Sequence, residues 1–326
     1  MMRVIPVAAF GLALSVAAAS LPGTLQAQDD PKRVPLPGDI ALKEDSARQR
    51  PLKWSMPDNP GSGPYAAIKA VDPAFPDHVI YRPAHLAGLK RPLAILLWGN
   101  GGCRGDGASA RLFLEEIASH GFLVIAPGTI LSGPGTPMPA DDKTMGKSLT
   151  ADVLAGLDLA EKANVAGMYK GRLDLARVAV AGTSCGGLQA LQAAADPRIK
   201  AAIGLHTGFF NDDRAPNTGE ATSKNQLRAL HTPVLYILGG PRDIAYENGM
   251  DDLTRIDHVP VVVASHAVGH LGTFNQTNGG SEAQVSLNWL NWQLYGDGKA
   301  GAEFTGKDCG LCRDREWALE RKKLLN

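Results

Sequence analysis

The sequence alternates short, uninterrupted apolar runs with longer stretches of helical periodicity, and this alternation restricts the fold more than any other feature. Short apolar runs bounded by glycine, proline or polar residues are typical of buried strands. Such runs cover residues 93–97, 122–126, 178–181, 201–205, 234–238 and 261–263. Apolar residues at helical spacing cover residues 108–120, 148–164, 187–195 and 281–295. Apolar strands that alternate with helices predict an α/β fold with a parallel sheet covered on both faces.

One of these strands ends in a G-x-S-x-G pattern, with Gly182 and Gly186 on either side of Ser184. A serine on a tight strand-to-helix turn presents its hydroxyl above the sheet, and the two glycines let the strand and the helix converge. The pattern alone carries little weight in a chain with 37 glycines, and an ordinary turn serine is the alternative. The position of Ser184 between the strand at 178–181 and a helix predicts a nucleophile.

Two other strand ends supply the partners that a nucleophilic serine needs. Asp243 follows the apolar run 234–238, and His270 follows the run 261–263. The carboxyl ends of parallel strands meet at one edge of the sheet, where such folds place their chemistry. A serine hydroxyl becomes reactive when a histidine takes its proton, and a buried carboxylate fixes the tautomer of that histidine. We therefore predict that Ser184, Asp243 and His270 act together.

With this spacing, the segments 79–83 and 117–126 give the chain a resemblance to the α/β-hydrolase superfamily of serine hydrolases. It is most similar to the branch of dienelactone-hydrolase-like, chlorophyllase-like and cutinase-like polyester hydrolases. The resemblance covers roughly residues 65–296 and includes the chain order serine, acid, histidine. It implies a mostly parallel sheet of eight strands with helices on both faces. It also implies hydrolysis of carboxylic esters through an acyl-enzyme, without a metal or an organic cofactor.

The resemblance further implies an oxyanion hole formed by two backbone N–H groups. One belongs to Cys185, the residue after the serine, and the other lies in Trp98-Gly99-Asn100, where many relatives have His-Gly-x. By register we assign the second N–H to Asn100, with Gly101 as the alternative. Both groups are expected to point at the oxygen that becomes negative in the tetrahedral intermediate.

Other acids and histidines compete for the catalytic roles. The competing acids are Asp212, Asp213, Asp251 and Asp252. Asp243 is preferred because it lies closest to the end of its strand. His270 is preferred over His266 because the residues after it resemble the family segment that follows the catalytic histidine. A zinc helix with both histidines is disfavoured by Gly269 and by the lack of a glutamate after His266. His120 is expected at a helix end.

The four cysteines suggest two disulfides. Cys103 lies just past the implied oxyanion loop and Cys185 follows the serine, so the two are expected on facing loops. We expect them to be bonded, with two buried thiols as the alternative, because the sequence does not fix their Cα separation. Cys309 and Cys312 form a C-x-x-C. A local disulfide is favoured over a redox or zinc site, because neither a second C-x-x-C nor a thioredoxin-like context accompanies it.

Residues 206–233 form an insert that is too short for a cap domain, and we expect a short lid there. A short lid implies an open cleft, which suits a polymer or a bulky ester. Trp98, Phe209 and Phe210 are candidates for an aromatic wall of that cleft, with burial in the core as the alternative.

The ends of the chain differ from its middle. Residues 1–27 have a basic start, an apolar stretch and a small residue before a cleavage site, which predicts a signal peptide and a secreted or periplasmic protein. Residues 28–64 are rich in proline, glycine and charge and predict a poorly ordered leader or a surface strap. Residues 65–296 are expected to be the catalytic domain, and residues 297–326 a tail with the C-x-x-C.

Composition excludes several classes of partner. The chain has 33 basic and 33 acidic residues, so its formal net charge of zero suggests neither nucleic acid nor an anionic membrane surface. No phosphate loop and no G-x-G-x-x-G follows a strand, so a nucleotide cofactor is not expected. An apolar fraction of 44% is sufficient for a full core.

Three functions remain open. The first is a secreted serine esterase for small or aromatic esters, and the second is an extracellular polyester or cell-wall ester depolymerase. The third is a secreted binding protein of the same fold without turnover. The set of Ser184, Asp243 and His270 argues against the third, because binding alone does not require those residues.

Overall fold

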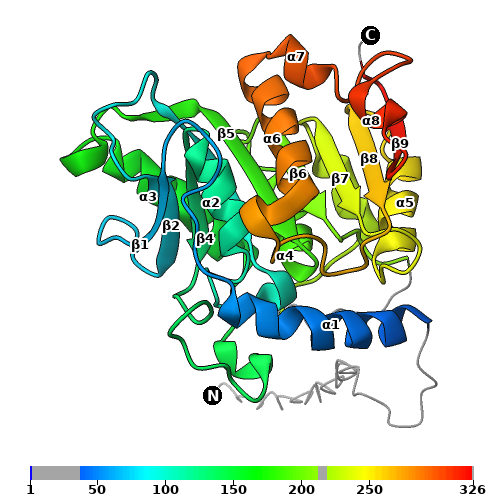
Figure 1. Ribbon diagram of the computed structural model, residues 1–326, viewed down its shortest axis with the longest axis horizontal. Coiled ribbons are helices and arrows are strands. Elements are labelled where there is room, and N and C mark those ends of the chain that lie inside the picture. The colour runs from blue at the N-terminus through cyan, green and yellow to red at the C-terminus, as the bar shows by residue number, and fades with distance from the viewer. Residues whose placement is uncertain (2–36, 212–218, 325–326) are drawn as a thin grey trace.

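The computed structural model describes residue 1 and residues 37–211 and 219–324, which form one mixed sheet with helices on both faces (Figure 1). In this described part, nine strands are hydrogen-bonded in the order β1-β2-β4-β3-β5-β6-β7-β8-β9. Their bounds are β1 Ala67–Val71, β2 His78–Pro83, β3 Leu93–Gly99, β4 Phe122–Pro127, β5 Leu173–Thr183, β6 Ala201–Leu205, β7 Val234–Leu238, β8 Val261–His266 and β9 Trp317–Lys322. The pairs from β4 to β8 are parallel, and the pairs made by β1, β2 and β9 are antiparallel.

Helices enclose this sheet in two layers. Their bounds are α1 Pro37–Ser55, α2 Arg111–Ser119, α3 Thr150–Ala163, α4 Cys185–Ala193, α5 Tyr246–Arg255, α6 Gly280–Tyr295, α7 Gly298–Gly301 and α8 Gly310–Arg313. Residues of α3, α4 and α5 belong to one buried apolar cluster, and residues of α2 and α6 belong to the other. The parallel sheet covered on both faces is therefore confirmed.

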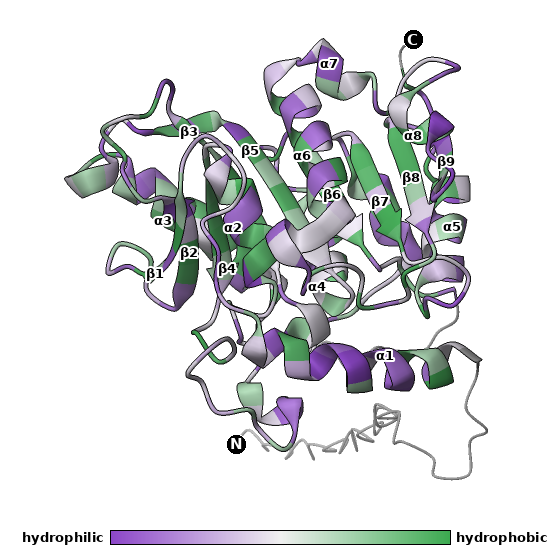
Figure 2. Cartoon of the chain, viewed as in Figure 1, coloured by the Kyte–Doolittle hydropathy of each residue, from purple (hydrophilic) through white to green (hydrophobic). Residues whose placement is uncertain are grey.

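The central strands β3, β6 and β7 are buried on both faces because they carry no charged side chain and are apolar along their length. All seven residues of β3 are buried. Ile95 and Leu97 pack in the cluster that contains α3, whereas Leu96 and Trp98 pack in the cluster that contains α2. Figure 2 shows these strands as predominantly hydrophobic, in contrast to α1, which is largely hydrophilic.

The sheet has one strand more than the eight that the resemblance implies. β9 lies within residues 297–326, where the sequence predicted a tail, and it pairs with β8 from Val261↔Lys322 to His266↔Trp317. As an edge strand, β9 has one buried residue, Trp317, followed by exposed and half-buried positions, and it lacks the continuous apolar run of a central strand. The described part of the tail therefore completes the sheet.

Residues 37–55 form a helix where the sequence predicted little regular structure. Figure 1 shows α1 crossing the edge of the sheet next to the end of β5. The helix has no apolar stripe and contains Pro51, which cannot donate a backbone hydrogen bond. Its contacts come from distant parts of the chain, through ion pairs of Lys53 with Asp106 at 3.0 Å and of Arg50 with Asp142 at 2.9 Å. Among the described residues, no helix is long and apolar enough to cross a membrane.

Candidate active site

Ser184 lies on a strained turn between β5 and α4. Its φ and ψ are 54° and −122°, a conformation that side chains rarely adopt. The backbone of this turn is held by a hydrogen bond from Ser184 N–H to the Leu205 carbonyl at 2.9 Å. A Cβ on Gly182 or on Gly186 would collide with the opposite backbone, at Gly186 and at Gly99 respectively. The two flanking glycines of the pattern are therefore required by close packing of strand and helix.

Ser184, His270 and Asp243 form a continuous hydrogen-bonded chain. The Ser184 hydroxyl lies 2.9 Å from His270 Nε2, and His270 Nδ1 donates to Asp243 Oδ1 at 2.6 Å. The three residues follow β5, β7 and β8, which end at the same edge of the sheet. Both His270 and Asp243 are buried, and Ser184 borders a pocket. This arrangement can transfer a proton from the serine to the histidine and stabilise the resulting imidazolium.

Four donors converge on the Asp243 carboxylate. Oδ1 accepts from His270 and from the Ala245 N–H at 2.9 Å, and Oδ2 accepts from the Gly239 N–H at 2.9 Å and from His206 Nδ1 at 3.0 Å. Burial acts to raise the pKa of Asp243, but the hydrogen bonds from the two histidines outweigh it and hold that pKa far below its usual range. Asp243 is therefore ionised at any pH at which the protein would be assayed.

The competing acids have other partners. Asp252 is buried and accepts from Tyr236 and Phe209, and Asp251 pairs with Lys224 and Arg255. Asp212 and Asp213 lie outside the described residues.

The competing histidines also lie elsewhere in the hydrogen-bond network. His266 Nε2 lies 2.8 Å from Glu282 Oε1, and its ring stacks on Trp317 with 3.9 Å between centroids. His120 pairs with Glu116 at a helix end. Neither residue reaches Ser184.

Sequence reasoning missed His206 and Glu282, which extend the network behind Asp243. His206 lies between the two carboxylates, with Nε2 3.0 Å from Glu282 Oε1. Its position directly after β6 is the same strand-end position that identified Ser184, Asp243 and His270. The sequence signal for Glu282 was an acid near the start of a predicted helix, at residues 281–295, which packs in the core. Among the described residues, no group of three His, Cys, Asp or Glu has a geometry that could hold a metal ion.

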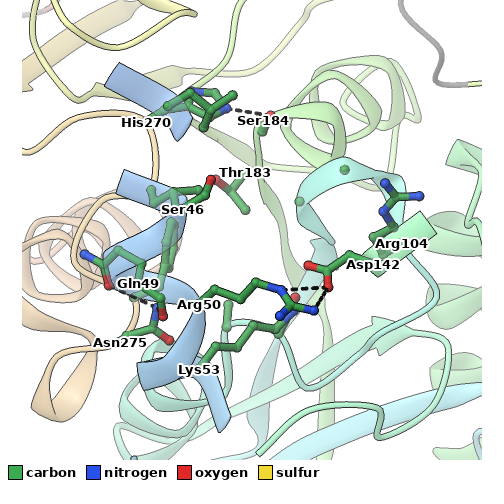
Figure 3. Close-up of a pocket in the computed structure, with 17 residues that line it drawn as sticks. Ser46, Gln49, Arg50, Lys53, Arg104, Asp142, Thr183, Ser184, His270 and Asn275 are labelled. Carbon is green, nitrogen blue, oxygen red and sulfur yellow. Dashed lines mark hydrogen bonds and ion pairs between the residues drawn. The ribbon is translucent and has the colours of Figure 1, made fainter. Parts of the chain in front are cut away.

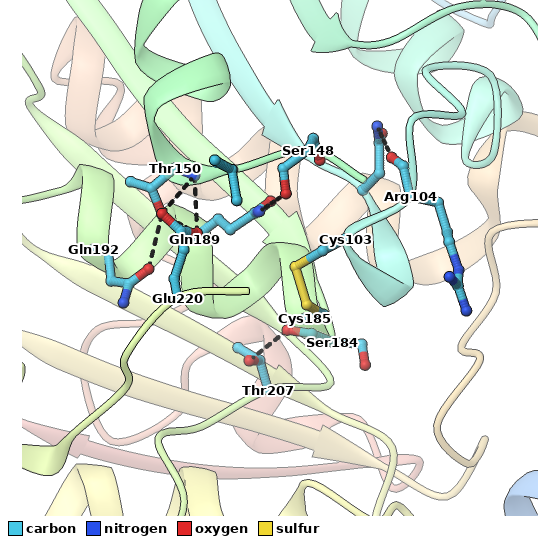
Figure 4. Close-up of a disulfide and its surroundings, with 12 residues drawn as sticks. Cys103, Arg104, Ser148, Thr150, Ser184, Cys185, Gln189, Gln192, Thr207 and Glu220 are labelled. Atoms are coloured by element: carbon cyan, nitrogen blue, oxygen red, sulfur yellow. Dashed lines mark hydrogen bonds between the residues drawn. A yellow bond between two sulfur atoms is a disulfide. The ribbon is translucent and has the colours of Figure 1, made fainter. Parts of the chain in front are cut away.

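The two expected disulfides, Cys103–Cys185 and Cys309–Cys312, are present. Figure 4 shows Cys103–Cys185 next to Ser184, where it ties the start of α4 to the loop that follows β3. The Cα atoms of this pair are 5.2 Å apart, within the range that a disulfide requires. As the first residue of α4, Cys185 has a backbone N–H without an acceptor inside the helix.

The Asn100 side chain lies at the same loop but has a structural role. Its amide donates to the carbonyls of Arg104 at 2.9 Å and of Pro127 at 2.8 Å, which fixes the loop after β3. The backbone N–H of Asn100 lies close to the Cα of Gly186 at the start of α4. The oxyanion roles of Asn100 and Cys185 remain predictions.

A pocket of about 390 Å³ lies between α1 and the end of β5. Figure 3 shows Ser46, Gln49, Arg50 and Lys53 on successive turns of α1, with Ser184 and His270 at one end of the pocket and Lys53 at the other. The remaining lining residues are Leu42, Gly101, Gly102, Arg104, Ser109, Ala110, Asp142, Leu271, Phe274 and Asn275. The roof of the pocket is therefore α1, and no described residue of the expected lid at 206–233 lines it.

The aromatic wall expected from Trp98, Phe209 and Phe210 is not found at this pocket. Trp98 is fully buried and packs on Phe274 with 6.0 Å between ring centroids, so Phe274 separates it from the pocket. Phe209 is fully buried in the opposite apolar cluster, and Phe210 packs against the same cluster. The core alternative holds for all three residues, because the end of β6 directs Phe209 and Phe210 toward α5 rather than toward Ser184.

Comparison with known proteins agrees with this geometry. The model of the dienelactone hydrolase family matches residues 87–293, a range that includes Ser184, Asp243 and His270. Curated proteins gave no match to the chain.

Proposed function

Because the chain belongs to the dienelactone hydrolase family, we propose that it hydrolyses carboxylic esters by a serine mechanism. The observation that carries the proposal is the hydrogen-bonded chain from Ser184 through His270 to Asp243, with distances of 2.9 and 2.6 Å. This series of hydrogen bonds begins at a serine that borders a pocket and ends at a buried carboxylate. It supplies a nucleophile, a general base and a residue that orients the base.

In the proposed mechanism, Ser184 Oγ attacks the ester carbonyl while His270 Nε2 takes the hydroxyl proton. Backbone N–H groups of Asn100 and Cys185 stabilise the negative oxygen of the tetrahedral intermediate. His270 then protonates the leaving alcohol, and an acyl-enzyme forms. Water, deprotonated by the same histidine, attacks the acyl-enzyme and releases the acid. Every step uses groups of this chain and water.

A fluorophosphonate probe tests the proposal. We expect Ser184 Oγ of the native protein to displace fluoride from the probe, because Ser184 carries the hydroxyl that His270 activates. Peptide mass spectrometry would then find the phosphonyl group on Ser184. We also expect it to hydrolyse a short p-nitrophenyl ester. Heat-denatured protein is the control and should remain unlabelled. A folded protein that is labelled on another serine, such as Ser148, or on none, would contradict the proposal.

The roof formed by α1 favours a small ester over a polymer. The short insert at 206–233 predicted an open cleft, whereas the structure has a pocket of about 390 Å³ with a helix across it. This volume is near the lower end of pockets that bind small molecules. Apolar side chains of Leu42, Ala110, Leu271 and Phe274 line part of the pocket, which suits an acyl or aromatic group. We therefore assign the chain to small esters rather than to insoluble polyesters.

Arg104 gives the pocket an unpaired positive charge. Of the cationic side chains that line it, Arg50 pairs with Asp142 and Lys53 pairs with Asp106. The Arg104 guanidinium has no ion pair or hydrogen bond to any described residue. An ester that carries a second, anionic group would supply the missing partner.

Replacing Arg104 should therefore change substrate preference. We expect Arg104→Gln to lower kcat/KM about tenfold for an ester with a carboxylate, and to leave a neutral ester of the same size within about twofold, since one charge-assisted hydrogen bond is lost. The matched control is Arg48→Gln on the outer face of α1, which does not line the pocket. Equal losses for both esters would show that Arg104 only supports the loop.

We also propose that the protein acts outside the cytoplasm. The segment 1–27 has the composition of a signal peptide, and the chain has two disulfides, which persist in oxidising compartments. Residues 2–27 lie outside the described part of the structure. N-terminal sequencing of the protein from culture supernatant or periplasm would test this, with cleavage after Ala27 as the expected result.

A further inference from the structure

His206 occupies a fully buried position between two carboxylates. Its Nδ1 lies 3.0 Å from Asp243 Oδ2, and its Nε2 lies 3.0 Å from Glu282 Oε1. The contact with Glu282 is close enough for an ion pair but is not aligned as a hydrogen bond. The side chains of all three residues have no exposed area. His206 therefore contacts the carboxylate oxygen of Asp243 that His270 does not contact.

This position requires a doubly protonated ring. A neutral imidazole has one nitrogen with a lone pair, and in either tautomer that lone pair would face a buried carboxylate oxygen. Burial acts to lower the pKa of His206, but the negative charges of Glu282 and Asp243 and the hydrogen bond to Asp243 outweigh it and raise that pKa to about 10. Burial acts to raise the pKa of Glu282, but its contacts with His206 and His266 hold that pKa well below its usual range.

The backbone keeps His206 in place. Its φ is 47°, in the left-handed region, and its N–H donates to the Ile237 carbonyl at 2.7 Å. Glu282 is fixed independently, because Oε2 accepts from the Thr273 N–H at 3.0 Å and Oε1 also faces His266. A Cβ on Gly272 would collide with both Glu282 and His206, so the adjacent loop leaves space for this contact.

We propose that His206 is a protonated positioning residue that fixes the Asp243 carboxylate and sets the pH at which His270 can act as a base. The proposal rests on the proposed serine mechanism and adds a residue to it. A positive charge next to Asp243 weakens the attraction of this carboxylate for an imidazolium at His270, whose ring centroid lies 6.1 Å from that of His206. Removing that positive charge should therefore strengthen the attraction of Asp243 for the imidazolium that forms at His270 in the proposed mechanism.

Few other charges act on this group. Glu282 from α6 and Asp243 from the loop after β7 are the carboxylates that face His206, and His270 and His266 are the other titratable groups of the network. From α1, Asp45 approaches Gly269, next to His270, and is paired with Arg48. Lys53 and Arg50 line the pocket and have acidic partners of their own.

Two variants with opposite expected effects test the proposal. His206→Asn keeps a donor for Asp243 and suits the left-handed backbone, but removes the charge. We expect it to move the acidic limb of the pH profile of kcat/KM upward by about one pH unit. Glu282→Gln removes the balancing anion, while the hydrogen bond to Asp243 keeps His206 protonated, and should move the same limb downward. Shifts of opposite sign are not expected from a residue that only supports packing, which would lower kcat without moving the limb.

An NMR titration of the wild-type imidazole resonances gives a readout that does not depend on turnover. Of the eight histidines, one should stay protonated to at least about pH 9, and its signals should be absent from His206→Asn. If that variant does not fold, Glu282→Gln and the wild-type titration still decide. An unmoved limb in a folded His206→Asn, or no histidine protonated above pH 8, would overturn the proposal. A wild type without esterase activity would instead refute the proposed function, and the NMR titration would still test the charge on His206.

Discussion

Asp243→Asn should lower kcat for ester hydrolysis about 10⁴-fold, the size of loss that an acid-to-amide change causes in a Ser-His-Asp triad. The reason lies in the four groups around the carboxylate, which are all donors: the N–H groups of Gly239 and Ala245 and the rings of His206 and His270. An amide has one acceptor oxygen, so its NH₂ group must face two of these donors. If it faces His270, the ring turns or changes tautomer, and Nε2 no longer accepts the serine proton.

Steady-state kinetics with a p-nitrophenyl ester would check this expectation, with thermal unfolding measured in parallel to show that the variant is folded. Asp251→Asn is the matched control, because Asp251 was a competing acid in the sequence and pairs with Lys224 and Arg255 at a distance from the pocket. It should keep full activity. If Asp243→Asn keeps kcat within tenfold of the wild type, another group orients His270 and the assignment of Asp243 is wrong.

The parts of the fold and site that could be predicted are those that short segments encode. The strands β3 and β7 are apolar along their whole length, so they were recognisable without knowledge of their neighbours. Ser184, Asp243 and His270 were recognisable because each follows such a strand, and parallel strands carry their ends to one edge. The structure places these three residues in contact, as expected from that rule.

The parts that could not be predicted depend on contacts between distant segments. α1 is polar, and it is held by Asp106 and Asp142, which are more than 50 residues away in the sequence. β9 has a mixed composition, and one of its contacts is the stacking of Trp317 on His266. Neither feature leaves a periodic apolar pattern. Their consequence for function is large, because α1 covers the pocket, whereas the sequence predicted a short lid at residues 206–233.

His206 illustrates a different limit. The strand-end rule applies to it as well, because it directly follows β6, but nothing in the sequence distinguished a second histidine next to the acid from a buried structural residue. Only the three-dimensional positions of Asp243 and Glu282 around its ring give it a charge and a role. When a histidine follows a central strand in addition to the three predicted catalytic residues, acids on the helices that cover the sheet should therefore be considered as its partners.

Loss of the Cys103–Cys185 disulfide should lower the free energy of unfolding by about 4.5 kcal/mol, the largest stability effect that we expect from a change outside the apolar core. The two cysteines are 82 positions apart, and a cross-link that closes a long loop removes much conformational entropy from the unfolded chain. The bond also joins the residue after Ser184 to the loop after β3, so its loss should loosen both sides of the proposed oxyanion hole.

Urea unfolding of Cys103→Ser/Cys185→Ser, compared with the wild type, would measure the effect. The chain contains its own control, because Cys309 and Cys312 are only three positions apart. The same loop-entropy relation gives about 1.6 kcal/mol for Cys309→Ser/Cys312→Ser. Both pairs remove one disulfide and add two hydroxyls, so the difference between them isolates loop length. Equal destabilisation by the two double variants would show that the Cys103–Cys185 bond does not act by restricting the unfolded chain, and its effect would then have to come from the packing around Ser184.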